Sequence, residues 1–333
     1  MRAVVTGGTG FIGSHLVEAL VARGGDVVCI TRPGAGAERR WITGVHARFI
    51  DCGFQDGRQL ARAIAGADVV FHIAGRTHGP PAELYASNVS ATARVLRAAA
   101  AQGSAAPHVI LASSIAAVGP CRDGVALTSA TVPAPISRYG RSKLAAEAQV
   151  RRYAGRVPAT ILRLPSVYGP RERALFRLIR WIARWGFALT IGTWDREASL
   201  IYVRDLVQGM IAAAGSPPGT QAVRLYYLAH PAPVSWAAFA AAVGRAVGRG
   251  SDPIRVSLPR GPALAFARCA EWLAALRGRS SSLNRDRVCE ISQRRWVCDP
   301  SSAIEELGFA ASFTLEEGMR ETVAWYRAAG WLQ

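Results

Sequence analysis

Two kinds of feature are scarce in this sequence, and each scarcity excludes a class of protein. Six scattered cysteines form no CxxC pair and no Cys/His cluster at metal-binding spacing, so we predict free thiols, no disulfide and no structural metal. Arg or Glu interrupts every apolar run before the roughly 18–20 residues that a membrane span requires. The N-terminus enters a strand-like segment without a charged leader. We therefore expect a cytoplasmic protein.

Lysine is almost absent, although the chain is strongly basic. Of its 40 basic residues 39 are arginines, Lys143 is the only lysine, and the formal net charge is +17. Such an excess favours anionic partners, among them nucleotide phosphates, nucleic acid and acidic membranes. The arginines are spread along the chain and no nucleic-acid motif accompanies them. We therefore interpret most of them as solvated surface residues and predict no nucleic-acid partner.

The N-terminal segment "RAVVTGGTGFIGSHLVEALVARG" predicts a dinucleotide site. It consists of a buried strand over 2–5, a glycine-rich turn, and a helix over about 11–22. Gly7 permits a tight turn, Gly10 lets the backbone approach a pyrophosphate, and Gly13 lets the helix lie close to the strand. The helix N-terminus adds amide donors through Phe11 and Ile12. Three glycines alone are a weak signal, but a strand before them and a helix after them is the context that the motif requires.

The end of the second predicted strand, 26–30, bears on the choice between NAD and NADP. An NAD site usually has a carboxylate there for the ribose hydroxyls, whereas this chain has Thr31 followed by Arg32. An arginine without the carboxylate suits a 2′-phosphate, so we predict NADP, with NAD as the alternative. Asp51 is expected to end a third strand, with its carboxylate near the adenine amine, and Cys52 follows it as a further residue of the predicted cofactor site. A fourth strand ends in the small residues Ile73, Ala74 and Gly75, which are expected to pass the cofactor.

Six segments in a fixed order, "TGGTGFIGSHL", "FHIAG", "NVSATARVLRAA", "LASSIAAVG", "YGRSK" and "LRLPSVYGP", resemble the extended short-chain dehydrogenase/reductase family. Its members include nucleotide-sugar epimerases and dehydratases, 3β-hydroxysteroid dehydrogenases and dihydroflavonol-type reductases. The resemblance is dense up to about residue 210 and looser beyond. It implies an α/β fold, a Rossmann doubly wound parallel sheet with helices on both faces, and a smaller, mostly helical C-terminal substrate lobe.

The resemblance gives the only lysine a chemical role. Tyr139 and Lys143 form the YxxxK pair of the family, one helical turn apart on a shared face. In the family this tyrosine moves the proton of the substrate hydroxyl while hydride moves to or from the nicotinamide. A free phenol has a pKa near 10, so ionisation near neutrality needs about 4 kcal/mol of differential stabilisation. We expect the compact ammonium and a cationic nicotinamide to supply it, and a planar guanidinium not to fit.

The same resemblance names further site residues. Ser114 matches the hydroxyl that bonds the reacting oxygen, with Ser113 as the alternative, and Asn88 matches an asparagine that supports the active-site backbone. A helix-capping role is the other interpretation of Asn88. The substrate set, named with least support, is Ser113, Ser114, Arg76 and Arg173. The segment after the sixth strand is expected to pass the nicotinamide through Leu164, Pro165, Ser166 and Val167.

The predicted organisation is a dinucleotide-binding domain over 1–165 and a substrate lobe over 166–333. The segment at about 200–228 is expected to return to the first domain, so the two are interleaved. The remainder, from about 229, is expected to be helical with turns. By analogy with the family we also expect a homodimer.

Departures from the family pattern restrict the reaction. Sugar 4,6-dehydratases carry an acidic pair after the catalytic hydroxyl, where this chain has Ile115 and Ala116. UDP-sugar epimerases often carry an arginine and an asparagine where this chain has Ala198 and Ser166. We therefore favour an NADP(H)-dependent reductase or dehydrogenase of a secondary alcohol or ketone. The alternatives are a nucleotide-sugar epimerase and a non-catalytic dinucleotide-binding scaffold.

The segment "ALFRLIRWIARWGFAL" combines a basic stripe with apolar residues. Arg173, Arg177, Arg180 and Arg184 recur at helical spacing. One interpretation is a lid that touches an acidic membrane surface and admits an apolar substrate. The other is a lobe helix that packs in the core and leaves its arginines in water.

Overall fold

The computed structural model describes residues 1–32, 34, 41–42, 44–122, 124–219, 222–276 and 284–332. Its centre is a seven-stranded sheet in the order β11-β6-β5-β4-β1-β2-β3, and every pair in it is parallel. These strands are β1 (Arg2–Thr6), β2 (Asp26–Thr31), β3 (Arg48–Asp51), β4 (Val69–His72), β5 (His108–Ser114), β6 (Ala159–Leu164) and β11 (Val223–Tyr227). The strand order reverses between β1 and β4, which is where ligands bind in open α/β sheets.

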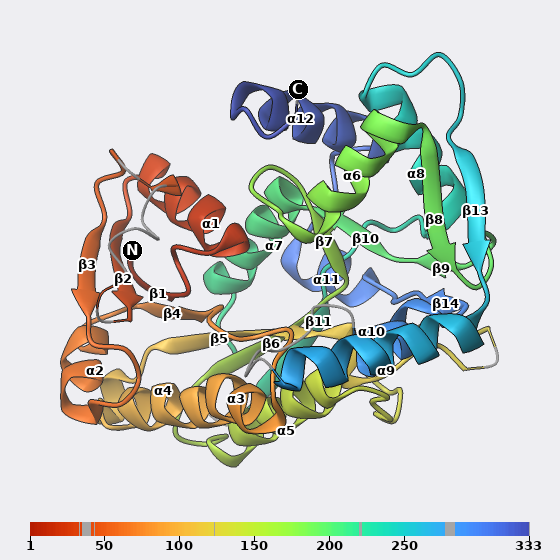
Figure 1. The fold of residues 1–333 in the computed structure, drawn as a ribbon. Coiled ribbons are helices and arrows are strands. Elements are labelled where there is room, and N and C mark those ends of the chain that lie inside the picture. The colour runs from red at the N-terminus through yellow and green to blue at the C-terminus, as the bar shows by residue number, and fades with distance from the viewer. Residues whose placement is uncertain are drawn as a thin grey trace.

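Helices cover both faces of this sheet (Figure 1). One face packs on α1 (Phe11–Ala22), α7 (Val203–Gly215) and α11 (Ser301–Leu307), and its core includes Leu16 and Met210. The other packs on α2 (Gly57–Ile64), α4 (Ala91–Ala100) and α5 (Arg138–Arg152). The central strands are buried almost throughout, as parallel strands covered on two faces must be. The predicted doubly wound Rossmann sheet is confirmed.

Shorter elements connect the sheet to its surroundings. The helical stretch before α4 consists of α3 (Pro81–Leu84) and a π-helical turn, η2 (Tyr85–Ser90). The 3₁₀ turns are η3 (Gly103–Ala105) and η4 (Ile115–Ala117). Strand β7 (Ser166–Tyr168) pairs with β10 (Leu200–Tyr202), so the chain leaves the sheet after β6 and returns beside its own exit.

The second lobe, predicted from the sequence to bind the substrate, has its own core, which includes Phe239, Tyr326 and Ile182. Its helices are α6 (Ala174–Trp185), α8 (Trp236–Ala246), α9 (Arg260–Leu276), α10 (Arg285–Ile291) and α12 (Leu315–Ala328). Its strands are β8 (Phe187–Ile191), β9 (Glu197–Ala198), β12 (Val234–Ser235), β13 (Ile254–Leu258) and β14 (Arg295–Trp296). From the sequence we expected only helices and turns after residue 229, and that detail was wrong, because β12, β13 and β14 are short strands in this part of the chain.

Candidate active site

The glycine-rich turn lies at the carboxyl end of β1. Gly7 has φ of 75°, and a Cβ there would lie 2.8 Å from the backbone nitrogen of Ala74. A Cβ on Gly13 would lie 2.1 Å from the Gly7 carbonyl oxygen. Both positions therefore exclude a side chain, one for the turn and the other for helix packing.

The start of α1 suits a pyrophosphate. Gly10 is the N-cap of α1, its side-chain position meets only the Gly7 oxygen at 3.3 Å, and no side chain caps the first helical amides. These amides and the helix dipole form an anion site. The residues present thus fit the cofactor that the motif predicts.

The adenosine end of the predicted site brings Thr31 and Asp51 together. The two residues are register partners on β2 and β3, and the Thr31 hydroxyl donates to the Asp51 carboxylate. Cys52 is buried beside them. From the sequence we placed Asp51 near the adenine but did not foresee this hydrogen bond. The bond holds the Asp51 carboxylate beside Thr31, which ends β2 and precedes Arg32 in the chain.

Tyr139 and Ser114 meet at the carboxyl end of β5. Ser114 ends β5 and caps η4, and Tyr139 lies in the first turn of α5. The Ser114 side chain lies close enough to Tyr139 to lower the pKa of its phenol. A Cβ on Gly140 would lie 2.2 Å from the carbonyl oxygen of Ala116, so the start of α5 touches η4. Sequence reasoning missed Gly140, although a glycine inside "YGRSK" was a visible signal.

Lys143 lies one turn further along α5. Its side chain is buried, and Nζ donates to the carbonyl oxygen of Ala112 over 2.6 Å. Burial lowers the pKa of Lys143 to about 8, while Glu147 acts in the opposite direction. Nζ would also lie 3.8 Å from a Cβ on Gly75. The ammonium is therefore next to the backbone that leaves β4, where we expect the cofactor to pass.

The groups of the chain shift the pKa of Tyr139 in the direction opposite to our expectation. Burial raises the pKa of Tyr139 to about 12, with Glu290 raising it further and Ser114 and Arg287 lowering it. Lys143 is not among the groups that shift it. The protein itself thus keeps this phenol protonated at neutral pH.

Asn88 supports the backbone after β4, as the resemblance implied. It lies on η2, and π-helical turns are frequent at functional sites. Its Oδ1 accepts from the Arg76 amide at 2.8 Å, and its Nδ2 donates to the Arg76 carbonyl at 2.9 Å. Nδ2 also donates to Ser142 Oγ at 2.8 Å, which ties this loop to α5.

A buried cluster that sequence reasoning did not identify lies behind Lys143. Glu147 accepts from Ser113 Oγ at 2.6 Å and pairs with Arg163, whose Nη2 is 2.8 Å from Oε2. Arg163 also donates to the Tyr227 hydroxyl at 2.9 Å. The pair is buried, and removal of one partner from such a pair typically costs about 3–5 kcal/mol. The Ser113 hydroxyl is therefore engaged with Glu147, and the structure brings Ser114 to Tyr139 instead.

The other residues named from the sequence lie at different distances from this centre. Arg76 forms a half-exposed ion pair with Glu83 at 2.8 Å, and Arg173 lies at the start of α6 over the ring of Trp331. Leu164 and Pro165 are buried where β6 ends, Ser166 is exposed, and Val167 is partly buried. The structure thus groups Ser114, Tyr139, Lys143 and Asn88, and does not bring Arg173 to them.

Helix α10 lies next to Tyr139. The Asp286 carboxylate accepts from the Arg138 amide at 2.7 Å, and Glu290 and Arg287 act electrostatically on Tyr139. Val288 of α10 packs against Ala263 and Ala267 of α9. Helix α10 therefore lies between Tyr139, whose side chain is partly exposed, and α9.

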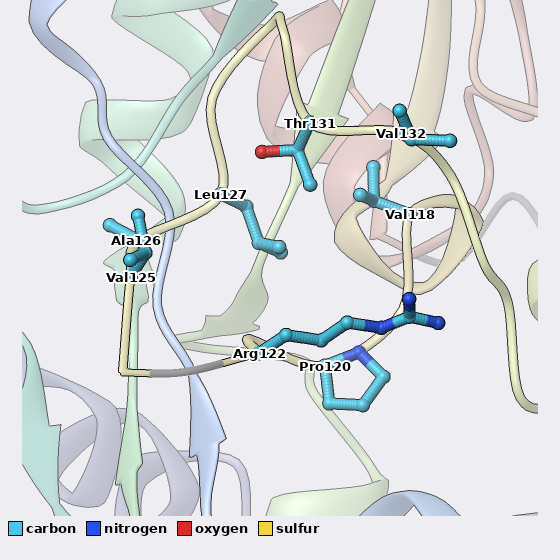
Figure 2. Close-up of a pocket in the computed structure, with 8 residues that line it drawn as sticks. All are labelled: Val118, Pro120, Arg122, Val125, Ala126, Leu127, Thr131 and Val132. Atoms are coloured by element: carbon cyan, nitrogen blue, oxygen red, sulfur yellow. The ribbon is translucent and has the colours of Figure 1, made fainter.

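The loop between Ser114 and Tyr139 carries a separate hollow of about 230 Å³ (Figure 2). Val118, Leu127 and Thr131 lie around it, with the Arg122 side chain across its lower side. It is smaller than the roughly 300 Å³ at which ligand pockets begin, and neither Ser114, Tyr139, Lys143 nor Asn88 lines it. We therefore do not assign the substrate to it.

Comparison with known proteins agrees with this geometry. The family model described as "NAD dependent epimerase/dehydratase family" matches residues 3–227. A ceramide reductase of Caulobacter vibrioides is 29% identical over 98% of this chain and 95% of its own length. A farnesyl-dihydroquinoline-oxide ketoreductase of Stigmatella aurantiaca is 27% identical over 96% of this chain and 95% of its own. MoeE5, solved with UDP-glucuronic acid and NAD, is 25% identical, covers 99% of this chain and all of its own, and superposes with a TM-score of 0.75.

Proposed function

The chain belongs to the NAD dependent epimerase/dehydratase family, and we propose that it is a reductase that converts an apolar ketone to a secondary alcohol at the expense of NADPH. It is an enzyme that binds a nicotinamide dinucleotide and acts on CH–OH or C=O groups. The direction and the substrate are the proposal. One observation carries it above the others: Tyr139 is partly buried beside Ser114, and burial raises the pKa of its phenol so that it keeps its proton.

The protonation state of Tyr139 favours reduction. A ketone that accepts hydride needs a proton on its oxygen, and a phenol with a pKa of about 12 holds that proton at neutral pH. When bound, the dinucleotide supplies hydride at its nicotinamide ring, which in the reduced form carries no positive charge that would ionise the phenol. The alcohol-to-ketone direction needs the phenolate instead, which burial disfavours.

Each catalytic residue has one task in this scheme. Ser114 and Tyr139 hold the ketone oxygen between two hydroxyls, and Tyr139 gives its proton. Lys143 remains beside the backbone at Gly75, where its ammonium can bind the ribose hydroxyls of the cofactor. Asn88 fixes that backbone and the position of α5 through Ser142.

Two sets of observations support an apolar substrate. Ala198 and Ser166 stand where UDP-sugar epimerases often have a diphosphate-binding arginine and an asparagine. The two reductases named above match the chain over almost their full lengths, and the names of both describe apolar compounds, a ceramide and a farnesyl derivative. A nucleotide-sugar epimerase remains the second candidate, supported by the family model and by the fold of MoeE5.

Labelled cofactor separates these two functions. With NADPH carrying deuterium at the transferred position and a panel of ceramide-like, steroid-like and prenylated ketones, a reductase consumes one NADPH per alcohol and places the label on carbon. An epimerase converts UDP-sugars without net cofactor consumption. Turnover of UDP-sugars alone, with no NADPH oxidised by any ketone, would overturn the proposal.

The preference for NADPH over NADH depends on Arg32. This residue follows β2, where a 2′-phosphate of the adenosine would lie. The carboxylate of Asp51, bonded to Thr31, is the opposing feature, because it suits the free ribose hydroxyls of NADH. We expect Arg32→Ala to raise KM for NADPH about tenfold or more and to leave KM for NADH within about twofold. Equal KM values of the wild-type enzyme for NADPH and NADH would contradict the proposed preference for NADPH.

A further inference from the structure

The outer face of the small sheet β8–β13 is apolar and exposed. The parallel register sets Ile254 beside Phe187, Val256 beside Leu189 and Leu258 beside Ile191, so these side chains share one face. On the opposite face Ala188 and Thr190 are buried against the lobe. Ile254 is 71% exposed, and Val256, Leu258 and Leu189 are each 38% exposed.

A parallel sheet with an apolar face that no other element covers is unusual. Parallel sheets are normally covered on both faces. Among the residues that the structure describes, every residue of β13 is exposed, and β8 is its only strand partner. Figure 1 shows β13 at the outer edge of the lobe, with its end leading into α9.

Helix α9 extends this surface. Ile191, at the end of β8, packs against a cluster formed by Ala263 and Ala267 of α9 and Val288 of α10. Other apolar side chains of α9 face solvent: Phe266 is 66%, Trp272 65% and Leu273 46% exposed. We call the exposed side chains of β8, β13 and α9 the outer apolar surface: Leu189, Ile254, Val256, Leu258, Phe266, Trp272 and Leu273.

Arginines outnumber carboxylates around this surface. Arg180 and Arg184 on α6 and Arg268 on α9 are exposed, as is Asp252 before β13, and Glu271 on α9 is partly exposed. Within the described part of the chain, none of these three arginines has a carboxylate oxygen within 4.0 Å. Trp181 and Trp185 of α6 are exposed beside Arg184, whose guanidinium lies over the Trp185 ring at 5.3 Å. Tryptophans and arginines around apolar side chains are typical of proteins that lie in a membrane interface.

We propose that the outer apolar surface inserts into the interface of a membrane rich in acidic lipids. The charge favours a lipid membrane over a second copy of the chain as the partner. If two copies met through these surfaces, their unpaired arginines would repel each other, and each copy has a net charge of +17. Helix α9 carries part of this surface and packs on α10, which lies next to Tyr139. In the bound state the membrane therefore lies near the helices beside the site. This inference goes beyond the proposed reaction and does not depend on it.

Vesicle binding tests the surface without any turnover. We expect the protein to co-sediment with vesicles of equal parts phosphatidylglycerol and phosphatidylcholine, and not with phosphatidylcholine alone. The double variants Phe266→Ser/Trp272→Ser and Ile254→Ser/Val256→Ser remove side chains that are exposed in the free protein, so folding is retained. Each should lower the partition coefficient about tenfold or more. The matched control Val132→Ser changes a side chain that is 82% exposed on another loop and should leave partitioning unchanged.

An environment-sensitive fluorophore on Cys269 supplies a second readout. Cys269 is the exposed cysteine of the chain and lies on α9 beside this surface, and the other five are buried or partly buried. Its emission should rise and shift to the blue with the acidic vesicles. Equal partitioning of both double variants and the wild type would overturn the proposal, because it would show that the net charge alone adsorbs the protein. A wild-type dimer that both double variants abolish, without vesicle binding, would assign the surface to a second copy instead.

Discussion

The single lysine of the chain shows how a residue type is fixed by its surroundings. Lys143 is enclosed, and its ammonium donates to the Ala112 carbonyl at 2.6 Å. A guanidinium is wider and planar, so it would displace α5 from β5. The chain uses arginine at 39 positions, yet the space at this one admits only the compact cation.

We predict that Lys143→Arg lowers kcat at least about 100-fold, because the cation can no longer reach the cofactor side of Gly75. Initial rates at saturating cofactor measure the effect, with circular dichroism to establish folding. The matched control is Arg141→Lys, which exchanges the same two residue types at an exposed position of α5 and should change kcat less than twofold. Near wild-type turnover of Lys143→Arg would refute the role given to Lys143.

At the scale of elements, the position of Tyr139 depends on the contact between α5 and η4. Gly140 allows the helix to touch the Ala116 carbonyl, and Ser137 caps the helix by accepting from the Gly140 amide at 2.9 Å. This contact sets Tyr139 against Ser114. A side chain at position 140 must therefore move one of the two elements.

We expect Gly140→Ala to destabilise the protein by about 1–3 kcal/mol and to lower kcat, because overpacking shifts α5. Urea unfolding and steady-state rates measure the two effects. Gly215→Ala is the matched control: Gly215 ends α7, and a Cβ there meets no atom within 4 Å. Wild-type stability and turnover in both variants would refute the role given to the contact between α5 and η4.

The elements differ in how far the sequence predicts them. The span of α1 and the end of β3 at Asp51 agree with prediction, because glycine spacing and apolar runs are local signals. Strand β13 was not predicted, since its five residues pair only with β8, far away in the chain. Glu147 was missed for a similar reason: it reads as a surface helix residue until Arg163 and Ser113 are placed beside it.

At the scale of the whole molecule, buried histidines make stability depend on pH. Burial lowers the pKa of His72 to about 3 and that of His15 and of His108 to about 4. Thr6 and Thr92 hydrogen-bond the two ring nitrogens of His72. Unfolded histidine binds a proton near pH 6.5 and the folded protein does not, so these residues lower stability as the pH falls from about 6.5 towards 4. The raised pKa values of the carboxyls of Glu172 and Glu290 act in the opposite sense.

We therefore predict that His72→Gln reduces the loss of unfolding free energy between pH 7 and pH 5 by about 2 kcal/mol relative to the wild type. Urea titrations at the two pH values give the difference. His46→Gln, at an exposed position before β3, is the control and should leave the pH dependence as it is. An unchanged slope in His72→Gln would show that His72 is protonated equally in both states.

The membrane and substrate proposals also belong to this scale. Every helix among the described residues is too short or too polar to cross a bilayer. One of the two interpretations of the sequence placed α6 against a membrane, whereas the structure exposes more large apolar side chains on β13 and α9 than on α6. Net charge is visible in the sequence, but the face on which apolar side chains gather depends on strand register and helix packing.

The most direct test of the central claim is a single-turnover measurement of hydride transfer from NADPH to a reducible ketone. The claim is that the phenol of Tyr139, held by Ser114, gives the proton. The account predicts that Tyr139→Phe slows the oxidation of bound NADPH at least about 1,000-fold and leaves the Kd of NADPH within about threefold. Oxidation of NADPH by Tyr139→Phe at the wild-type rate would contradict it.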